Sequence, residues 1–147
     1  MKIQPMRVYR CKNNDVTTLL DLGYSAPIMD SEEIEQLTPN TQDAAQEKHV
    51  PVLYFENGRL TVKVGEQPHP MTPDHYIKWI LVQTCTGGSF SLLTPEDAPQ
   101  AYFDVKEDQT LNVYAYCNLH GLWKAQVELL EFDQMVCSAE FPQGCIE

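Results

Sequence analysis

The sequence predicts an all-β fold, an antiparallel β-sandwich with a small N-terminal appendage. After residue 50, short stretches rich in β-branched and aromatic residues recur, separated by turn signals. Only one brief segment, residues 40–48, has the composition of a helix. Seven short strands at this spacing, with so little helix, are typical of two packed antiparallel sheets.

The first two expected strands, Pro51–Glu56 and Arg59–Val64, flank Asn57-Gly58, the dipeptide best suited to a type I′ hairpin turn. The five strands expected after them lie at residues 75–84, 89–93, 101–105, 111–117 and 123–132. Before the first strand, Asn40 is expected to cap a short helix that ends at Lys48, with Asp43 three residues after the cap.

Residues 1–37 have a different character. They contain one strand-like piece at residues 6–12, a turn at Gly23 and an acidic stretch at residues 30–35. We therefore expect three parts: an appendage at residues 1–37, the sandwich at 38–130 and a C-terminal tail at 131–147.

Composition excludes several classes of protein. Hydrophobic residues are 43% of the 147-residue chain and charged residues 21%, so the chain can bury a core and is not expected to be disordered. The net charge of −11 argues against a nucleic-acid partner, because neutralising phosphates requires clustered Lys and Arg. No apolar run is long enough to cross a membrane, and the N-terminus lacks the apolar region of a secretion signal, so we expect a cytoplasmic protein. The five cysteines, odd in number and scattered, do not predict a disulfide framework.

The four histidines and one cysteine form the candidate site. His75 and Cys117 adjoin expected strands, while His49 and His69 lie where strands begin or turn, and His120 belongs to a Cys-x-x-His motif with Cys117. Any one histidine alone is more often a surface or core residue, but loops at one end of a sandwich can bring such residues together.

If these five residues converge, their number and chemistry indicate the metal. Structural zinc uses four ligands, so a fifth protein ligand argues against it. Mixed nitrogen and sulfur donors favour iron over magnesium or calcium. Five ligands are one short of an octahedron, which leaves a position for chemistry.

Four motifs, EKHVP (47–51), VKVGEQPHPM (62–71), HYIKWI (75–80) and YCNLHGLWK (116–124), closely resemble the superoxide reductase family of neelaredoxins and desulfoferrodoxins. The resemblance covers residues 38–130. It implies an immunoglobulin-like sandwich and the one-electron reduction of superoxide to hydrogen peroxide at one non-haem iron ion. It also implies an external electron donor of the rubredoxin type, and a homodimer.

Matched residue by residue, the family's four equatorial histidines correspond to His49, His69, His75 and His120, and its axial thiolate to Cys117. The resemblance further implies that Glu47 closes the sixth position in the oxidised state and that Lys48 guides superoxide. Outside these roles, Trp79 and Trp123 are interpreted as core aromatics, Lys124 as a solvated side chain, and Cys85, Cys137 and Cys145 receive no role.

The appendage departs from the family. VYRC (8–11) and QLTPNTQDAA (36–45) resemble the ends of a desulforedoxin-like domain whose iron is held by four thiolates, but only Cys11 remains. Asn14 and the Met29-Asp30 pair stand where the other cysteines are expected. One thiolate cannot build such a centre, so no second iron is expected and the appendage is predicted to serve packing or dimerisation. The alternative is a site that recruits Cys137 or Cys145.

Two other functions compete with this interpretation. A cupredoxin-like copper protein also combines a β-sandwich with Cys-x-x-His, but it uses two histidines and a weak axial methionine, and no methionine lies between His120 and Met135. A non-catalytic module with structural zinc predicts tight zinc binding and no reaction with superoxide.

Overall fold

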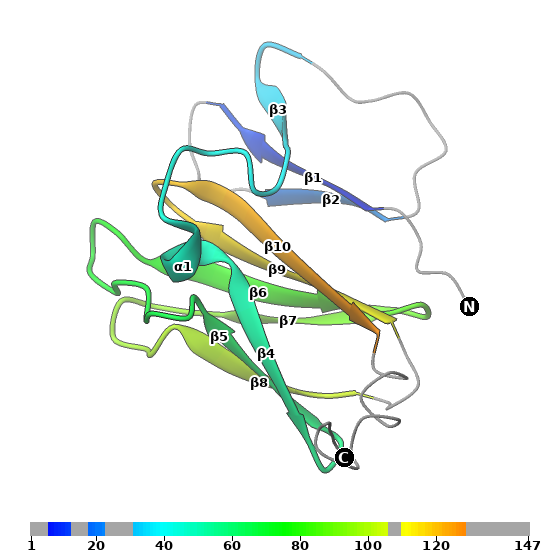
Figure 1. Cartoon of the computed structure of the whole chain (residues 1–147). Coiled ribbons are helices and arrows are strands. Elements are labelled where there is room, and N and C mark those ends of the chain that lie inside the picture. The colour runs from blue at the N-terminus through cyan, green and yellow to red at the C-terminus, as the bar shows by residue number, and fades with distance from the viewer. Residues whose placement is uncertain (1–5, 13–17, 23–30, 106–109, 129–147) are drawn as a thin grey trace.

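The computed structural model describes residues 6–12, 18–22, 31–105 and 110–128. Seven strands form two antiparallel sheets packed face to face (Figure 1). The four-stranded sheet has the order β10-β9-β6-β7 and the three-stranded sheet the order β4-β5-β8. The bounds are β4 Pro51–Glu56, β5 Arg59–Val64, β6 Ile77–Gln83, β7 Gly88–Leu92, β8 Gln100–Asp104, β9 Thr110–Cys117 and β10 Gly121–Glu128. The immunoglobulin-like sandwich expected from the sequence is confirmed.

The alternation of side chains along the central strands creates two apolar faces. On β6, Ile80 and Val82 face the core between the sheets, whereas Trp79 and Leu81 belong to a second cluster on the other face. The core between the sheets is completed by buried residues from β5, β8 and β9, including Leu60, Val62, Phe103, Val113 and Cys117. Cys117 therefore lies at the edge where the core meets the end of the sandwich.

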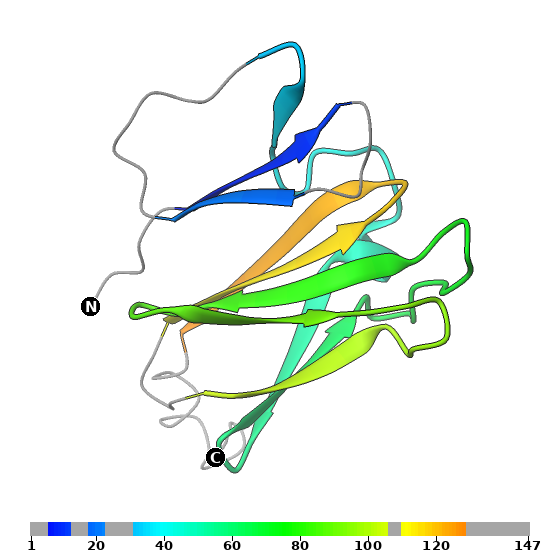
Figure 2. The same ribbon diagram turned by 180° about the vertical axis from the view of Figure 1, so that it is seen from behind.

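The appendage forms a small sheet of its own with the order β2-β1-β3 (Figure 2). Its strands are β1 Met6–Cys11, β2 Thr18–Leu22 and β3 Ile34–Leu37, where the sequence predicted only one. This sheet covers the outer face of the four-stranded sheet, because its Val8 and Leu37 pack with the second apolar cluster. Gly23, predicted as a turn, lies outside the described residues.

The predicted helix at residues 40–48 is wrong over most of its length. The only helix in the described residues is α1, Gln46–His49, and its N-cap Ala45 has no side-chain hydrogen bond. Asn40 instead adopts a left-handed backbone with φ of 62°, and its side chain accepts from Lys124 N–H at 2.8 Å and donates to Lys124 C=O at 3.1 Å. Asn40 therefore bonds the segment between β3 and α1 to β10, and it does not cap a helix. No helix in these described segments is long and apolar enough to cross a membrane.

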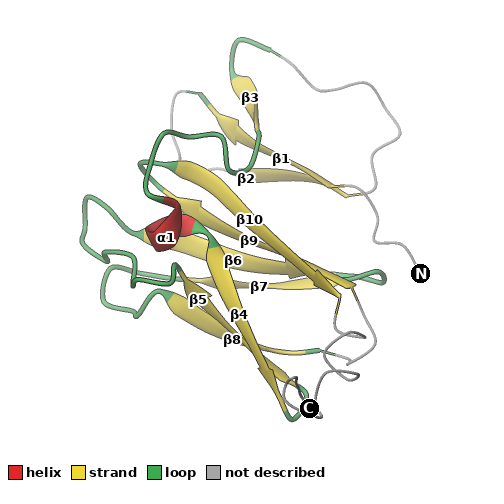
Figure 3. Cartoon of the chain, viewed as in Figure 1, coloured by secondary structure: helices red, strands yellow, loops and turns green. Residues whose placement is uncertain are grey.

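The hairpin between β4 and β5 is confirmed. Asn57 and Gly58 have φ of 53° and 80°, the pair of positive values that a type I′ turn requires. The other end of the sandwich gathers α1, the connection from residue 65 to 76 and the turn at 118–120 (Figure 3). Strand β6 begins at Ile77 rather than at residue 75, because His75 forms an isolated bridge with Thr72 in this connection.

Candidate metal centre

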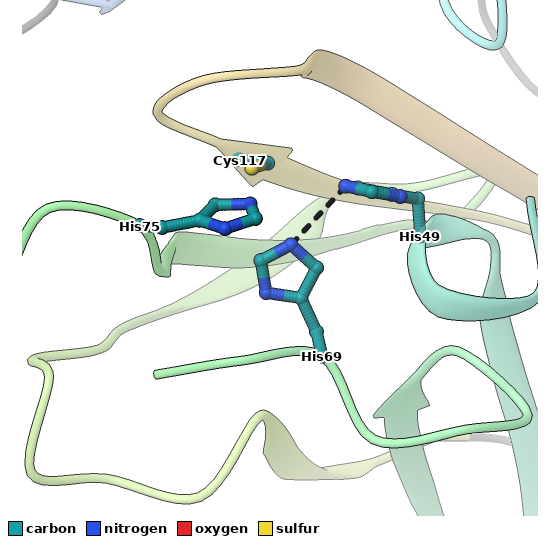
Figure 4. Close-up of side chains that lie close together, drawn as sticks. All are labelled: His49, His69, His75 and Cys117. Atoms are coloured by element: carbon teal, nitrogen blue, oxygen red, sulfur yellow. Dashed lines mark hydrogen bonds between the residues drawn. The ribbon is translucent and has the colours of Figure 1, made fainter. Parts of the chain in front are cut away.

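The five predicted donor residues come from four places at this end of the sandwich. His49 ends α1, His69 and His75 belong to the connection between β5 and β6, Cys117 ends β9, and His120 lies in the turn before β10. Figure 4 shows the side chains of His49, His69, His75 and Cys117 directed toward a common centre.

The distances between donor atoms place all five residues in one group. One ligand atom from each of His49, His69, His75 and Cys117 lies within 4.8 Å of the others. The Nε2 atoms of His49 and His69 are 3.1 Å apart. His120 joins the group through its Nδ1, which lies 3.2 Å from His49 Nε2 and 3.9 Å from Cys117 Sγ.

Two backbone carbonyls determine which ring nitrogens face the centre. Nδ1 of His49 donates to Ala45 C=O at 2.7 Å, and Nδ1 of His69 donates to Pro70 C=O at 2.7 Å. A carbonyl only accepts, so each Nδ1 carries the proton and each neutral ring turns a lone pair on Nε2 toward the centre. For His120 the nitrogen directed at the group is Nδ1.

The close approach of these lone pairs needs a cation. Burial lowers the pKa of His69 to about 4, and burial also lowers the pKa of His49, so both rings are neutral near pH 7. No proton is then left to form a hydrogen bond across the 3.1 Å between their Nε2 atoms. Nε2 of His75 is buried as well and has no hydrogen-bond partner among the described residues. Such a set of buried, unpartnered lone pairs fits a metal ion.

Cys117 supplies the one anionic donor that the group could gain. Burial raises the pKa of its thiol, against the opposing effect of hydrogen bonds from the backbone of His120 and Leu119. The thiol is therefore protonated near pH 7 in the absence of a cation, and a metal ion would displace its proton.

Lys48 and Glu47, predicted to act beside the metal, are both exposed on α1. Burial is the main cause of the lowered pKa of His75, and the positive charge of Lys48 lowers it further, as it does that of His49. The positive charge of Lys48 therefore acts on two of the histidines of the centre. The Glu47 side chain instead lines an open hollow with Glu66 and belongs to no group of donor atoms in the described structure.

Close backbone packing fixes the position of α1. Gly65 has φ of 87°, and a Cβ there would lie 2.6 Å from Lys48 Cα, so only glycine fits at this approach. Gly65 N–H donates to Val50 C=O at 3.1 Å and Gln67 N–H to Glu47 C=O at 2.9 Å. These contacts tie the segment that bears His69 to the helix that bears His49.

Trp123 has a role that the sequence alone did not reveal. It is fully buried, as expected of a core aromatic, but its ring stacks on His49 with centroids 4.8 Å apart. Its Nε1–H donates to His120 C=O at 3.0 Å. Trp123 therefore supports two of the donor residues, and its position three residues after His120 was the only available signal.

Comparisons with known proteins agree with this geometry. The sequence profile of the desulfoferrodoxin family matches residues 41–126. A desulfoferrodoxin from Clostridium acetobutylicum is 41% identical over 123 residues, covering 83% of this chain and 97% of the relative. A superoxide reductase from Pyrococcus horikoshii is 38% identical over 110 residues, covering 63% and 96%. Among solved structures, the superoxide reductase from Treponema pallidum matches with a TM-score of 0.65 at 33% identity, over 80% of this chain and 98% of that one.

Proposed function

Because the chain belongs to the desulfoferrodoxin family, we propose that it reduces superoxide to hydrogen peroxide at one iron ion held by His49, His69, His75, His120 and Cys117. The chain is an oxidoreductase that acts on superoxide, as its relatives named superoxide reductase indicate. The reaction consumes one electron and two protons for each superoxide. The observation that supports this proposal most is the convergence of five donor residues on one centre.

The donor set suits the chemistry that iron supplies when bound, which is the transfer of one electron. Four imidazoles are neutral ligands, so among these five residues only the Cys117 thiolate would offset the charge of the ion and favour its oxidised state. Backbone carbonyls hold the rings of His49 and His69 in place, which would limit rearrangement when the charge of the ion changes.

Lys48 guides the substrate in this proposal. The chain carries a net charge of −11, which repels an anion such as superoxide on average. Lys48 is exposed beside the centre, and its charge acts on His49 and His75. Local positive charge of this kind raises the rate of encounter without altering the reaction itself.

Glu47 is proposed to close the remaining coordination position in the oxidised state. It lies two residues before His49 on the same helix, and its side chain is exposed and so able to move. In a Glu47→Ala variant, the visible spectrum of the oxidised protein is expected to respond to lower concentrations of added azide than the parent's. An unchanged azide response would remove Glu47 from this role.

The electron donor, the oligomer and the location stay predictions: a rubredoxin-type donor, a homodimer and the cytoplasm. Exposed apolar side chains on two edge strands, Leu20 and Leu22 on β2 and Phe90 and Leu92 on β7, support self-association. Light scattering at micromolar concentration tests it, and a monomer mass would contradict it.

The proposal is tested by purifying the protein without oxygen, measuring its metals and oxidising it. We expect one iron per chain and a broad visible absorption from the thiolate–iron pair. Copper at full occupancy would instead support the cupredoxin-like alternative, and zinc without reactivity toward superoxide would support a structural metal. No second iron is expected, so two irons per chain would instead support the alternative of a second metal site that includes the N-terminal segment.

A further inference from the structure

The geometry points to Asn118 as a positioning residue that fixes His75 within the metal centre by joining its backbone to that of Cys117. This inference rests on the proposed function, because it concerns the same five donor residues. Asn118 belongs to neither the donor set nor the pair formed by Glu47 and Lys48.

His75 is the histidine that most needs such support. The rings of His49 and His69 are each anchored by a hydrogen bond from Nδ1 to a backbone carbonyl. Among the described residues, the hydrogen bonds of His75 all involve its backbone N–H and C=O, and none anchors its ring. His75 is also only partly buried, whereas His49 and His69 are 3% and 2% exposed. Its position must therefore be set through its backbone.

On one side, the backbone of His75 is held by a tight turn. Thr72 N–H donates to His75 C=O at 3.0 Å, and His75 N–H donates to Thr72 C=O at 3.1 Å. The Thr72 hydroxyl also accepts from His75 N–H at 3.2 Å and donates to His75 C=O at 3.3 Å. This turn shapes the loop locally but does not connect it to the other donors.

Asn118 provides that connection by bracketing His75. Its side-chain Oδ1 accepts from Tyr76 N–H at 3.0 Å, and its Nδ2 donates to Asp74 C=O at 3.0 Å. Its own backbone N–H donates to Tyr76 C=O at 3.2 Å. The residues on both sides of His75 are thus hydrogen-bonded to the residue that directly follows Cys117.

The consequence is a rigid link between donors that are distant in the chain. Asn118 lies between Cys117 and His120, so its amide fixes the distance from their turn to the His75 loop. In an Asn118→Ala variant both side-chain bonds to this loop would be lost, and the Asn118 N–H bond would remain. The removal of hydrogen bonds that orient a metal ligand typically weakens metal binding about 10- to 100-fold.

The chain contains a matched control for a merely structural effect. Asn40 makes the same three kinds of bond: its side chain donates to Lys124 C=O and accepts from Lys124 N–H, and its N–H donates to Leu122 C=O at 3.0 Å. These bonds flank Trp123, which supports His49 and His120, but none of them reaches the His75 loop. Asn40→Ala should therefore cost at least as much stability as Asn118→Ala, because it also leaves alanine at a positive φ.

The test compares parent, Asn118→Ala, Asn118→Asp and Asn40→Ala in the iron-loaded, full-length protein. The readouts are the rate of iron loss to excess chelator, the position of the thiolate–iron absorption band, and thermal unfolding. We expect Asn118→Ala to lose iron at least about tenfold faster and to shift the band. Asn118→Asp, which keeps the acceptor for Tyr76 N–H, should lie between it and the parent. Asn40→Ala should stay within about twofold of the parent despite its lower unfolding temperature.

Equal rates of iron loss in Asn118→Ala and Asn40→Ala would overturn the inference. If the parent binds no iron, the proposed function fails instead, and the positioning role is then decided with Co²⁺ as the probe. In that arm, Asn118→Ala should bind Co²⁺ at least about tenfold more weakly than Asn40→Ala. Equal Co²⁺ affinities would reject the role.

Discussion

The N-terminal sheet and the metal centre are two parts of this chain that are held in place by different forces. The sheet packs Val8 and Leu37 onto Trp79 and Leu81, and Arg10 donates to the hydroxyl of Tyr116 at 3.1 Å. The centre instead gathers imidazoles, of which His49 and His69 are buried, and the buried Cys117 thiol at one end of the sandwich. One region gains stability from apolar contact, whereas the other collects polar groups that are costly to bury without a cation.

This difference shows how apolar packing can hold a small sheet in place. Residues 1–37 contain a single cysteine, Cys11, which ends β1. The described strands around it still form a sheet, because side chains of the four-stranded sheet provide an apolar surface for it. Apolar packing can therefore hold this sheet in place, and the sequence predicts no tetrathiolate iron centre in it.

The largest expected effect comes from removing the thiolate. A Cys117→Ser variant is expected to bind iron at least about 100-fold more weakly, since it loses a ligand rather than a supporting hydrogen bond. Iron per chain and the visible spectrum measure the effect. Cys85→Ser is the matched control, because Cys85 lies outside the donor group, and it should keep its iron. One tightly bound iron in Cys117→Ser would remove Cys117 from the centre.

A substitution in the N-terminal sheet should instead lower the stability of the protein without changing its iron content. Leu37 is 8% exposed within the cluster beneath this sheet. Leu37→Ala is expected to lower the free energy of unfolding by about 2–3 kcal/mol through loss of apolar contact and the cavity left behind. Urea unfolding measures the loss, while iron per chain should not change. Loss of iron in this variant would show that the two regions are not independent.

The metal-free protein should lose stability in acid. The pKa of His69 falls from 6.5 to about 4 on folding, mainly through burial, so the unfolded chain binds more protons below pH 6.5. Stability is therefore fully present above pH 6.5 and is lost as the pH falls toward 4. His69 alone accounts for roughly 2 kcal/mol between about pH 7 and pH 5, and His49 and His75 act in the same direction.

Urea unfolding of the metal-free protein at pH 7 and pH 5 checks this prediction. A His69→Gln variant, which lacks the titrating ring, should lose less stability over the same interval. Equal stability of the parent at both pH values would contradict the buried, neutral state of the ring. Cys117 has the opposite dependence on pH. Burial raises the pKa of its thiol above 9.0, so the folded chain holds this proton more tightly and the stability falls as the pH rises above 9.0.

The smallest effect is expected from charge near the centre. Lys48→Ile should slow the reaction with superoxide about tenfold at low salt and leave iron binding intact. Lys12→Ile makes the same change in net charge within the N-terminal segment, where Lys12 is exposed. Rapid-mixing measurements of both variants separate local guidance from overall charge. Equal slowing by the two variants would mean that only the net charge matters.

The strands of the sandwich could be predicted well because each depends on local pattern. Alternation and turn chemistry act over a few residues, so Asn57-Gly58 and the seven strands could be located. The five donor residues were found through their motifs, and the structure brings all five together. Their roles as ligands, and those of Glu47 and Lys48, stay proposals.

The features that could not be predicted depend on partners far along the chain. Asn40 has the side chain of a helix cap, but its amide binds Lys124, 84 residues away. Asn118 bonds to residues 42 and 44 positions earlier, and Trp123 reaches the ring of His49. The strands β2 and β3 were missed because their exposed and partly buried residues show little alternation without β1 beside them.

The reduction of superoxide by one iron held by five donors can be tested in a single reaction. Ferrous protein is mixed with a known amount of superoxide, and oxidised iron, hydrogen peroxide and oxygen are measured together. We predict one iron oxidised and one hydrogen peroxide formed for each superoxide, without release of oxygen. Oxygen release, or ferrous iron that superoxide leaves unchanged, would contradict this mechanism.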